Sequence, residues 1–516
     1  MTPAVPAQYP TPFRRMLITI PLMISMIMVA VDVTIANVAL PHMQASLSAS
    51  QDQILWVLTS YLVAGAIATP LSGWLAGRFG RKNVMLVSVC GFTVTSMLCG
   101  LAVDLSTIVI ARTLQGAFGA ALIPLSQAIL LDINPPEDHA KAMAIFALGS
   151  MAGPIVGPSL GGYLTDSLNW RWVFFINVPF GILSFAGMFA FLVRRHSGRH
   201  GREKLRFDLF GFLTVSIVLT SLQLLLDRGE HVGWWESTEV QVYALILGLS
   251  AYLTLVHMFT ASDTFIRPQL FRDRNFAIGL LFSTLIGIVA FATVPLLVVM
   301  TQSLLGYSAL HTGMIGIPRA LGTLASTLIV TRLMALLDVR VLLIAGLAVI
   351  GTSMLMYSRM NLYVDDGTLI AIGLVQGFGS GLIFVPLSVV VFSTLDPKLR
   401  NEGASMYALT RNVGNSVGIS LLNVLFIHDS AISRNSLIQG LRPDNPAILS
   451  ARPDLDFGSG EALGSLNGEV VRQASMVGNA SLYHFVFIIS LCLMPLVLLL
   501  RSKKTPARGM ALPIGD

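Results

Sequence analysis

Charged residues are scarce in this chain: Asp, Glu, Lys and Arg make up 12% of its 516 residues, whereas 54% are hydrophobic. Soluble globular proteins carry roughly 25% charged residues, so the composition argues against a soluble domain. Cysteine is scarce too. The three cysteines all fall within apolar stretches and lack metal-ligand spacing, which argues against a disulfide framework or a zinc site. We therefore expect no metal ion and no cofactor.

Signals for processing and for catalysis are missing as well. The first apolar run, from about Met16 to Ala39, is too long for the hydrophobic region of a cleaved signal peptide. The apolar stretches contain no Ser/His/Asp set, no His-rich set and no paired carboxylates. We therefore expect no catalytic residues, and an enzyme is disfavoured.

What the chain does contain is a series of apolar runs, each about 20 residues long, the length that a helix needs to cross a bilayer. They predict an all-α polytopic membrane protein. The fourteen candidate spans are 16–39, 54–76, 84–103, 106–131, 141–164, 171–193, 208–227, 240–260, 276–301, 312–335, 341–359, 368–394, 403–427 and 481–501.

The basic residues orient these spans. An even number of spans places both termini on one side, and that side collects 23 Lys and Arg residues against seven on the other. Because cytoplasmic loops accumulate basic residues, both termini are predicted in the cytoplasm. Topology thus explains the net charge of +6 better than a nucleic-acid partner does. Residues 428–480 become a long outer loop, whose second half is interpreted either as a tethering segment, the default for such a loop, or as a surface helix leading into the last span.

Two distant stretches repeat each other at a constant offset of 261 residues. "FALGSMAGPIVGPSL" (146–160) aligns with "YALTRNVGNSVGISL" (407–421), and Gln115-Gly116 falls on Gln376-Gly377. The repeat is displaced by eight spans, as expected for two six-span halves with two extra spans between them. The predicted domains are a six-helix bundle (1–193), a basic cytoplasmic loop with two inserted spans and a connecting loop (194–274), a second six-helix bundle (275–501) and a cytoplasmic tail (502–516).

Six phrases of the sequence resemble one known family. Together they are similar to the major facilitator superfamily, and within it to the fourteen-span drug–proton antiporters of the EmrB/QacA type. The phrases are "VDVTIANVALP" (31–41), "LSGWLAGRFGRK" (71–82), "RTLQGAFGAALIP" (112–124), "GSMAGPIVGPSLGG" (149–162), "NWRWVFFINVPFG" (169–181) and "LLLDRG" (224–229).

The resemblance implies the major facilitator fold, two six-helix bundles with two extra central spans. It also implies the export of drugs or other amphipathic molecules in exchange for protons, in the inner (plasma) membrane of a cell. If the source is Gram-negative, it further implies a periplasmic adaptor protein that bridges to an outer-membrane channel, with the loop 428–480 as a contact.

The loop between spans 2 and 3 resembles the superfamily's cytoplasmic signature, which by this resemblance latches the two bundles together. Its matching residues are Gly73, Arg78, Gly80, Arg81 and Lys82. The family pattern carries an Asp where this chain has Gly77, so the usual charge relay at this gate is in doubt. Arg78 and Arg81 are expected to meet carboxylates or helix C-termini.

Span 5 carries glycines at every fourth position, which fall close to one helix face and form a groove for a neighbouring backbone. The prolines remove backbone donors and loosen the helix. Tight packing alone accounts for this pattern. The resemblance adds a role in the gate between inward and outward states, typical of exporters. The residues concerned are Gly149, Gly153, Pro154, Gly157, Pro158, Gly161 and Gly162.

One aspartate and three arginines lie inside spans, where charged residues usually mark an ion or substrate pathway. Asp32 lies about seven residues, roughly 10 Å, from the outer end of span 1, and Arg112 lies roughly 9 Å from the outer start of span 4. They are at similar depth, so a pair is geometrically possible. Asp32 is either a proton carrier whose charge gates release or a structural anchor paired permanently with Arg112.

Other polar residues within spans are candidates for lining a central cavity or for capping carbonyl groups. They are Asn37, Gln115, Arg319, Gln376 and Arg411.

The leading hypothesis is a proton-driven exporter of drugs or other amphipathic small molecules. The nearest alternative is an exporter of the same fold for a dedicated natural substrate, such as a siderophore, an antibiotic product or a lipid. A proton-coupled importer is less favoured, given the span-5 motif. A non-transporting membrane sensor would need a soluble output domain, and no terminal segment is long enough. The nucleotide-binding motif G-x-x-x-x-G-K-[ST] is absent, which disfavours ATP as the energy source.

Overall fold

The computed structural model describes residues 9–54, 56–192, 208–229, 232–261, 264–396, 399–441 and 459–501, and over these ranges the chain is helical without a strand. The predicted all-α class is confirmed. The first part of the chain forms α1 (Pro12–Ser46), α2 (Gln51–Ile54), α3 (Trp56–Phe79), α4 (Arg81–Leu101), α5 (Leu105–Gly119), α6 (Leu122–Ile133), α7 (His139–Ser167), α8 (Trp172–Phe175) and α9 (Asn177–Phe191).

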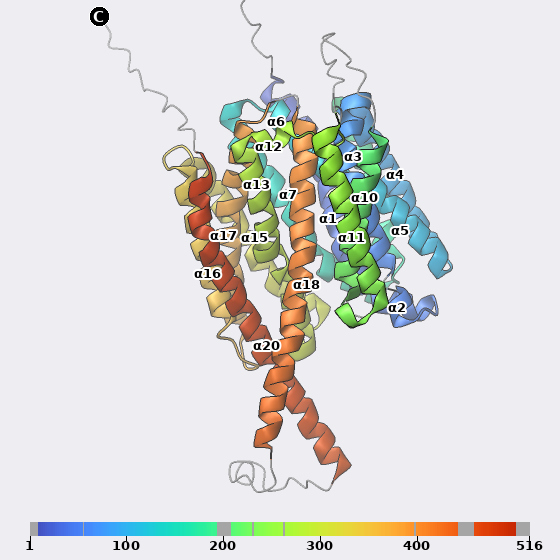
Figure 1. The fold of residues 1–516 in the computed structure, drawn as a ribbon, viewed down its shortest axis with the longest axis vertical. Helices are drawn as coiled ribbons and strands as arrows, with labels where there is room; N and C mark the ends of the chain where they lie inside the picture. Colours follow the sequence, from blue (N-terminus) through green and yellow to red (C-terminus); the bar gives the residue numbers. More distant parts are fainter. Residues whose placement is uncertain are drawn as a thin grey trace, which may run out of the picture.

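The remaining helices follow in two groups (Figure 1). The middle group is α10 (Leu209–Gly229), α11 (Thr238–Thr260) and the single turn α12 (Gln269–Arg272). The last group is α13 (Arg274–Ile286), α14 (Thr293–Val299), α15 (Ala309–Leu333), α16 (Val339–Tyr357), α17 (Asp366–Ser393), α18 (Arg400–Gly440) and α20 (Gly460–Leu496).

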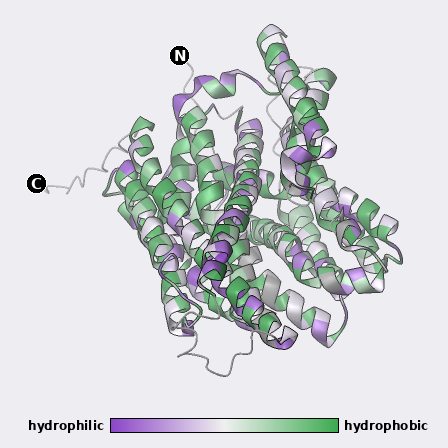
Figure 2. Cartoon of the chain, turned by 60° about the horizontal axis from the view of Figure 1, so that its bottom comes forward, coloured by the Kyte–Doolittle hydropathy of each residue, from purple (hydrophilic) through white to green (hydrophobic). Residues whose placement is uncertain are grey.

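Among the described residues, 12 helical segments are long and apolar enough to cross a membrane. They match twelve of the predicted spans. The two other predictions, 141–164 and 276–301, coincide with α7 and with the interrupted segment that begins at α13. Figure 2 shows hydrophobic residues along most of the helix surfaces, as a lipid environment requires. The chain is therefore a multi-pass membrane protein, and the total of fourteen spans stays a prediction.

The helices pack as two bundles that contact each other along a few helices. In the first bundle α1 packs on α7 and α9, and α3 and α4 pack on α5; in the second, α17 packs on α15 and α16, and α18 on α20. The bundles meet where α7 contacts α15 and α17 and where α3 and α6 contact α18. The inserted α10 packs on α11, α3 and α18, while little of α11 is buried. The domain boundaries at 193 and 274 stay a prediction.

One predicted span is not a regular helix. The segment 276–301 contains two π-helical stretches, Gly287–Phe291 (η3) and Met300–Leu304 (η4), on either side of α14. A π turn lets a backbone carbonyl turn away from its helical partner, and such turns are frequent at functional sites. Here the carbonyl oxygen of Ala290 accepts a hydrogen bond from Arg319 Nη2 at 2.8 Å.

The predicted outer loop 428–480 needs correction, because helices fill both of its ends. α18 continues to Gly440, and α20 begins at Gly460 and runs without a break into the last span. Of the two interpretations of the second half of the loop, the helix is confirmed, as the first part of α20. With 41 residues, α18 is about 60 Å long, twice the roughly 30 Å of hydrocarbon in a bilayer. Figure 1 shows α18 and α20 projecting together beyond the other helices.

The two extended helices contact each other in the projecting part. Gly478 of α20 lies against Ser430 and the carbonyl of Phe426 in α18, and Arg434 Nη2 donates to Asn467 Oδ1 at 3.1 Å. The helices thus touch in the first part of the projection, and Figure 1 shows their far ends diverging. We call the projecting part, 428–440 with 460–480, the hairpin stem.

Contacts between helix ends show which ends lie together. Arg15 near the start of α1 pairs with Asp138 just before α7, and Asn275 at the start of α13 binds the carbonyl of Arg501 after α20. We call the end of the molecule where Arg15, Asp138, Asn275 and Arg501 lie the basic end. The hairpin stem lies at the opposite end (Figure 1).

Candidate functional site

The buried charge pair of the first bundle is the centre of the candidate site. Asp32 of α1 is 0% exposed and Arg112 of α5 is 1% exposed, and Arg112 Nη1 lies 2.7 Å from Asp32 Oδ2. The pair that the span depths allowed is present. A charge buried this deeply is tolerated only with a partner of opposite sign and with hydrogen bonds to the remaining polar atoms.

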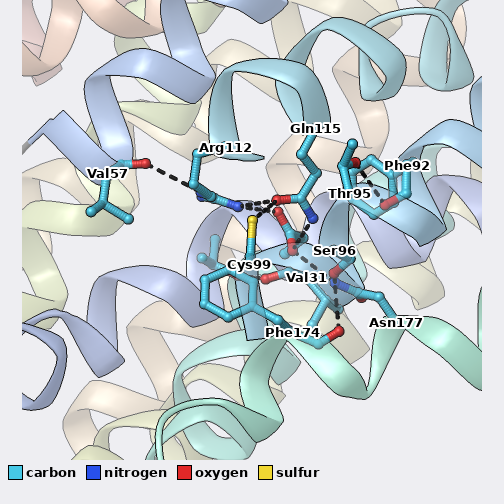
Figure 3. A network of polar contacts seen from close by, with 12 residues as sticks. Val31, Val57, Phe92, Thr95, Ser96, Cys99, Arg112, Gln115, Phe174 and Asn177 are labelled. Atoms are coloured by element: carbon cyan, nitrogen blue, oxygen red, sulfur yellow. Dashed lines mark hydrogen bonds and ion pairs between the residues drawn. The ribbon is translucent and has the colours of Figure 1, made fainter. Parts of the chain in front are cut away.

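Two further donors complete the surroundings of the carboxylate (Figure 3). Gln115 Nε2 donates to Asp32 Oδ1 at 3.0 Å, and Asn177 Nδ2 donates to the same oxygen at 2.7 Å. Asn177 also donates to Ser96 Oγ at 2.9 Å. The carboxylate thus accepts hydrogen bonds from α5 on one side and from the start of α9 on the other.

The guanidinium of Arg112 is held on all sides. Its Nε donates to the carbonyl of Val57 at 3.2 Å, and its Nη1 donates to Gln115 Oε1 at 2.8 Å. The guanidinium carbon lies 4.3 Å from the ring centre of Tyr61 and 5.5 Å from that of Phe174, distances that permit cation–π attraction. Five elements (α1, α3, α4, α5 and the α8–α9 segment) therefore meet at one polar centre inside an apolar bundle.

Sequence reasoning named Asp32 and Arg112 as a possible pair and gave Gln115 as a candidate for cavity lining or carbonyl capping. It missed the other side chains of this centre, among them Asn177, Ser96 and Tyr61. Asn177 lies in the family phrase at 169–181, so that phrase was the available signal for it. Ser96 and Tyr61 belong to no phrase, and a lone Ser or Tyr inside a span carries no signal of its own. Of the other candidates, Asn37 is exposed, Arg319 donates to the carbonyl of Ala290 in the second bundle, and Arg411 lies on α18 of that bundle.

The second bundle repeats part of this centre without its charges. The offset of 261 places Gln376 on Gln115 and Thr293 on Asp32, and Gln376 Nε2 donates to Thr293 Oγ1 at 3.3 Å. The same offset places Gly373 on Arg112. One amide-to-helix contact is therefore kept in both halves, while the ion pair belongs to the first half alone.

The glycines of span 5 meet α1 as the groove predicts. A Cβ added at Gly153 would collide with the carbonyl of Ala30, and one added at Gly157 would collide with the side chain of Thr34. Thr34 Oγ1 in turn donates to the carbonyl of Gly153 at 2.8 Å. Gly149, Gly161 and Gly162 are buried on the same helix. The side chains of Pro154 and Pro158 lie outside the described residues, and the gating role of the motif stays a prediction.

The loop between α3 and α4 joins the two bundles at the basic end. Arg81 pairs with Asp132 at the end of α6, and Arg400 Nη1 at the start of α18 lies 3.0 Å from the other oxygen of the same carboxylate. A nearby hydrogen bond, 3.1 Å between the Oγ atoms of Ser72 and Ser405, also crosses between α3 and α18. Asp132 thus supplies a carboxylate at this junction of the bundles, although Gly77 stands at the family's Asp position, and the predicted role of the loop as a gate stays a prediction.

The other residues of the loop have separate roles. Lys82 Nζ donates to the carbonyl of Phe189 near the C-terminus of α9 at 2.7 Å, a type of contact that was predicted for Arg78 and Arg81 and not for Lys82. Gly80 has φ +84°, a left-handed conformation that favours glycine. Gly73 is buried in α3. Arg78 is exposed and lies over the rings of Trp74 and Phe79, so the predicted carboxylate partner holds for Arg81 and not for Arg78.

The inserted helices are tied down at the basic end by Asp208. Its carboxylate accepts from the backbone N–H of Gly211 and of Phe265, and it lies 2.8 Å from His257 Nε2. Burial raises the pKa of Asp208, but these hydrogen bonds outweigh it and hold the pKa below its ordinary value. One carboxylate therefore connects the start of α10, the end of α11 and the segment that follows.

Comparison with known proteins decides the family. The model of the Major Facilitator Superfamily matches residues 22–419. The chain belongs to the major facilitator superfamily. It is 31% identical over 94% of its length to the multidrug export protein EmrB of Escherichia coli K12, covering 95% of that relative, and 29% identical over 93% to the fatty acid resistance protein FarB of Neisseria gonorrhoeae, covering 95%.

A solved structure supports the fold independently of these sequence relatives. The human organic anion transporter MFSD10 superposes with a TM-score of 0.58 at 14% identity, over 93% of this chain and 100% of the other. At this identity the likeness shows the shared fold alone. As a member of the superfamily, the chain has the predicted fold class.

Proposed function

We propose that this chain is a secondary active exporter of drugs or other amphipathic small molecules, driven by proton antiport, with Asp32 as the proton carrier. The relatives named for multidrug export and fatty acid resistance, which match almost end to end, support export of amphipathic compounds. They also support a transporter rather than an enzyme. The observation that supports proton coupling is the buried carboxylate of Asp32, which lies where five helical elements meet.

The hydrogen bonds of Asp32 explain how a proton would act. Both carboxylate oxygens face N–H donors from Arg112, Gln115 and Asn177. A carboxylic acid carries an O–H of its own, which cannot face another donor, so protonation costs at least one of these bonds. It also removes the charge that compensates Arg112. Loading a proton therefore weakens the contacts that hold α1 to α5 and α9.

This weakening reaches the groove on α7 through α1. Asp32 and Thr34 lie two residues apart on that helix, and Thr34 contacts Gly153. A change in the position of α1 at Asp32 would therefore alter the packing of α1 on α7. Helix α7 in turn contacts α15 and α17 of the second bundle. One proton moving inward contributes roughly 2.3 kcal/mol per 100 mV of membrane potential, enough to bias two conformations of similar energy.

Two alternatives compete with this proposal. Asp32 and Arg112 would be a permanent anchor if the pair never separates, and export would then need another coupling site. A dedicated natural substrate, such as a siderophore, an antibiotic product or a lipid, would use the same fold and the same driving force. The relative named for fatty acid resistance favours a lipid-like substrate among these.

The proposed setting is the inner membrane, with the basic end in the cytoplasm. In a Gram-negative cell the hairpin stem then projects into the periplasm, where an adaptor protein leading to an outer-membrane channel would meet it. The stem carries exposed apolar residues that suit such a contact, among them Ile432, Leu437 and Val471.

The test is efflux from proteoliposomes that contain the purified full chain and a fluorescent amphipathic dye. An imposed proton gradient should drive dye movement, a protonophore should stop it, and ATP should be without effect. The Asp32→Asn variant should bind the dye but lose gradient-driven movement, whereas Thr293→Val, at the matching position of the second bundle, should keep it. Wild-type transport by Asp32→Asn would refute the role of Asp32.

A further inference from the structure

The two oxygens of the Asp32 carboxylate have different partners, which determines where a proton binds. Oδ2 lies 2.7 Å from Arg112 Nη1, and a guanidinium group carries donors only. Oδ1 accepts from Gln115 Nε2 at 3.0 Å and from Asn177 Nδ2 at 2.7 Å. A proton on Oδ2 would set an O–H against the guanidinium, whereas the amides that face Oδ1 have an acceptor as well as donors. The proton therefore belongs on Oδ1.

The amide of Gln115 is fixed in its present orientation. Its Oε1 accepts from Arg112 Nη1 at 2.8 Å and from Cys99 Sγ at 3.5 Å. Turning this amide over, to present Oε1 to a protonated Asp32, would place its N–H groups against the guanidinium. Because both groups are then donors, the buried cation would lose an acceptor, which is costly. Gln115 thus remains a donor to Asp32 in either protonation state.

The amide of Asn177 differs from that of Gln115 because its second partner is a hydroxyl group. Asn177 Nδ2 also donates to Ser96 Oγ at 2.9 Å, and Ser96 Oγ donates in turn to the carbonyl of Phe174 at 3.0 Å (Figure 3). A serine hydroxyl both donates and accepts, and its hydrogen rotates to suit the partner. Asn177 and Ser96 are 2% and 0% exposed, so bulk water does not replace these partners.

We propose that Asn177 turns its side-chain amide over when Asp32 binds a proton, so that Asn177 Oδ1 accepts the new O–H. The same amide oxygen then accepts from the Ser96 hydroxyl, whose hydrogen leaves the carbonyl of Phe174. The N–H bond from Asn177 to Asp32 is the bond that protonation costs, and an O–H bond in the reverse direction replaces it. This inference rests on the proposed function and makes Asn177 the positioning residue for the proton.

The turned amide carries the protonation of Asp32 to the break between α8 and α9. Helix α8 ends at Phe175 and α9 begins at Asn177, so the amide is attached to the first residue of α9 and the released carbonyl of Phe174 lies in α8. Both helices pack on α1 and α4. Loss of the bond between Ser96 and Phe174 therefore loosens α8 from α4 at the point where α9 begins.

The test is infrared difference spectroscopy of the purified full chain in detergent, between neutral and acidic pH and without a gradient. The carboxylic C=O stretching band that Asp32→Asn removes belongs to protonated Asp32. Asn177→Leu takes away the acceptor of its O–H, so the band should move to higher wavenumber. Gln115→Leu is the matched control, because it removes a donor from the same oxygen and no acceptor, and it should move the band far less. Equal shifts in the two variants would overturn the amide turn.

A second measurement needs no substitution at Asn177 and decides the question if Asn177→Leu does not fold. Wild-type protein with ¹³C in the side-chain carbonyl of its asparagines should show a changed asparagine C=O band on acidification, because that oxygen of Asn177 gains two hydrogen bonds. The change should be missing in Asp32→Asn. A protonated Asp32 without any change in an asparagine band would overturn the amide turn.

Transport measures the consequence of the amide turn. In proteoliposomes Asn177→Leu should slow gradient-driven dye movement about tenfold, the factor that one hydrogen bond in the protonated state supplies. Ser96→Thr keeps a hydroxyl group and should lie closer to wild type than Ser96→Ala. Equal rates for the two Ser96 variants would overturn the transfer of the signal through Ser96.

Failure of this inference is distinguishable from failure of the proposed function. If Asp32→Asn removes a carboxylic band that keeps its wild-type frequency in Asn177→Leu, Asp32 remains the proton carrier and the amide turn is rejected. If no such band appears at any pH, Asp32 is rejected as the proton carrier, and the amide turn with it.

Discussion

The two bundles surround an arginine inside a span in opposite ways. In the first, Arg112 meets Asp32, Gln115 and the rings of Tyr61 and Phe174, and its charge is compensated inside the protein. In the second, the partly buried Arg319 donates to the backbone carbonyl of Ala290, and among the described residues no carboxylate lies within ion-pair distance of it. Duplication repeated the helices and the glutamine contact, but it did not repeat the charge balance.

The difference bears on the proposed proton coupling. A compensated pair responds to one small ion, the proton, because protonation of the acid undoes the pair. An arginine without a carboxylate partner has no such response. On the proposed function, the proton therefore acts in the first bundle alone. The following experiments test this difference between the bundles, beginning with the largest expected effect.

Removing each arginine should have contrasting effects on stability. Arg112→Leu leaves the carboxylate of Asp32 buried without a cation, which costs about 3–5 kcal/mol. Arg319→Gln removes a charge that the protein does not compensate, so stability should stay within about 1 kcal/mol of wild type or rise. Thermal unfolding of both variants in one detergent measures the contrast. Equal losses of stability in the two variants would contradict the proposed difference between the two arginines.

The double variant Asp32→Asn with Arg112→Gln sharpens the first half of that result. Because no unpaired charge remains, it should recover most of the stability that Arg112→Leu loses.

The packing between helices should respond alike in both halves. A Cβ at Gly153 would collide with the carbonyl of Ala30, and a Cβ at Gly414 would collide with the carbonyl of Thr284. Gly153→Ala and Gly414→Ala should each cost about 1–3 kcal/mol by forcing the helices apart. Gly248→Ala, with nothing within 4 Å of its added Cβ, is the control and should be neutral or stabilising. Unfolding temperatures that do not separate Gly153→Ala from the control would contradict the groove.

The junction between the halves should show a smaller, measurable coupling. Asp132 and Arg400 have side chains 22% and 19% exposed, so water weakens the pair, and a coupling energy of about 0.2–1 kcal/mol is expected. A double-mutant cycle with Asp132→Asn and Arg400→Gln gives this value from unfolding temperatures. Additive single effects would show that the bundles are not held together by this pair.

The smallest effect concerns the inserted helices, which belong to neither half. The pKa of Asp208 is held below its ordinary value of about 3.9 by bonds that outweigh burial. The ionised form therefore stabilises the fold above that pH, and the contribution is lost as pH falls through the folded-state pKa. Asp208→Asn should unfold at a lower temperature at pH 7 and converge with wild type near pH 3. A constant gap between them would exclude this titration.

The sequence was sufficient to predict features that depend on the spacing of apolar residues and glycines and on the number of residues between a position and the end of its helix. Apolar runs located the helices, and counting residues from the span ends placed Asp32 level with Arg112, because helix rise converts residue number into depth. Glycines at every fourth position predicted that a neighbouring helix approaches α7 closely, and the structure shows that this helix is α1. Each of these follows from the geometry of a single helix.

The sequence could not predict contacts that form only when several helices pack together. Asn177 reaches Asp32 only because α9 packs on α1, and Ser96 accepts from Asn177 only because α4 packs on α9. Asp132 meets Arg400 across 268 residues of chain. The length of α18 was missed for a different reason. Its projecting part is polar enough to look like a loop, yet it pairs with α20 and stays helical. The polarity of a segment indicates that it faces water, but it does not show whether its backbone is helical.

The continuity of α18 has one more consequence. The helix begins at Arg400, in the ion pair with Asp132, and ends at Gly440, in the hairpin stem. A rigid helix of this length acts as a lever. If it rotates by a few degrees about a point near its middle, each of its ends moves by several ångströms. A protein that grips the stem would therefore press mechanically on the junction at the opposite face of the membrane.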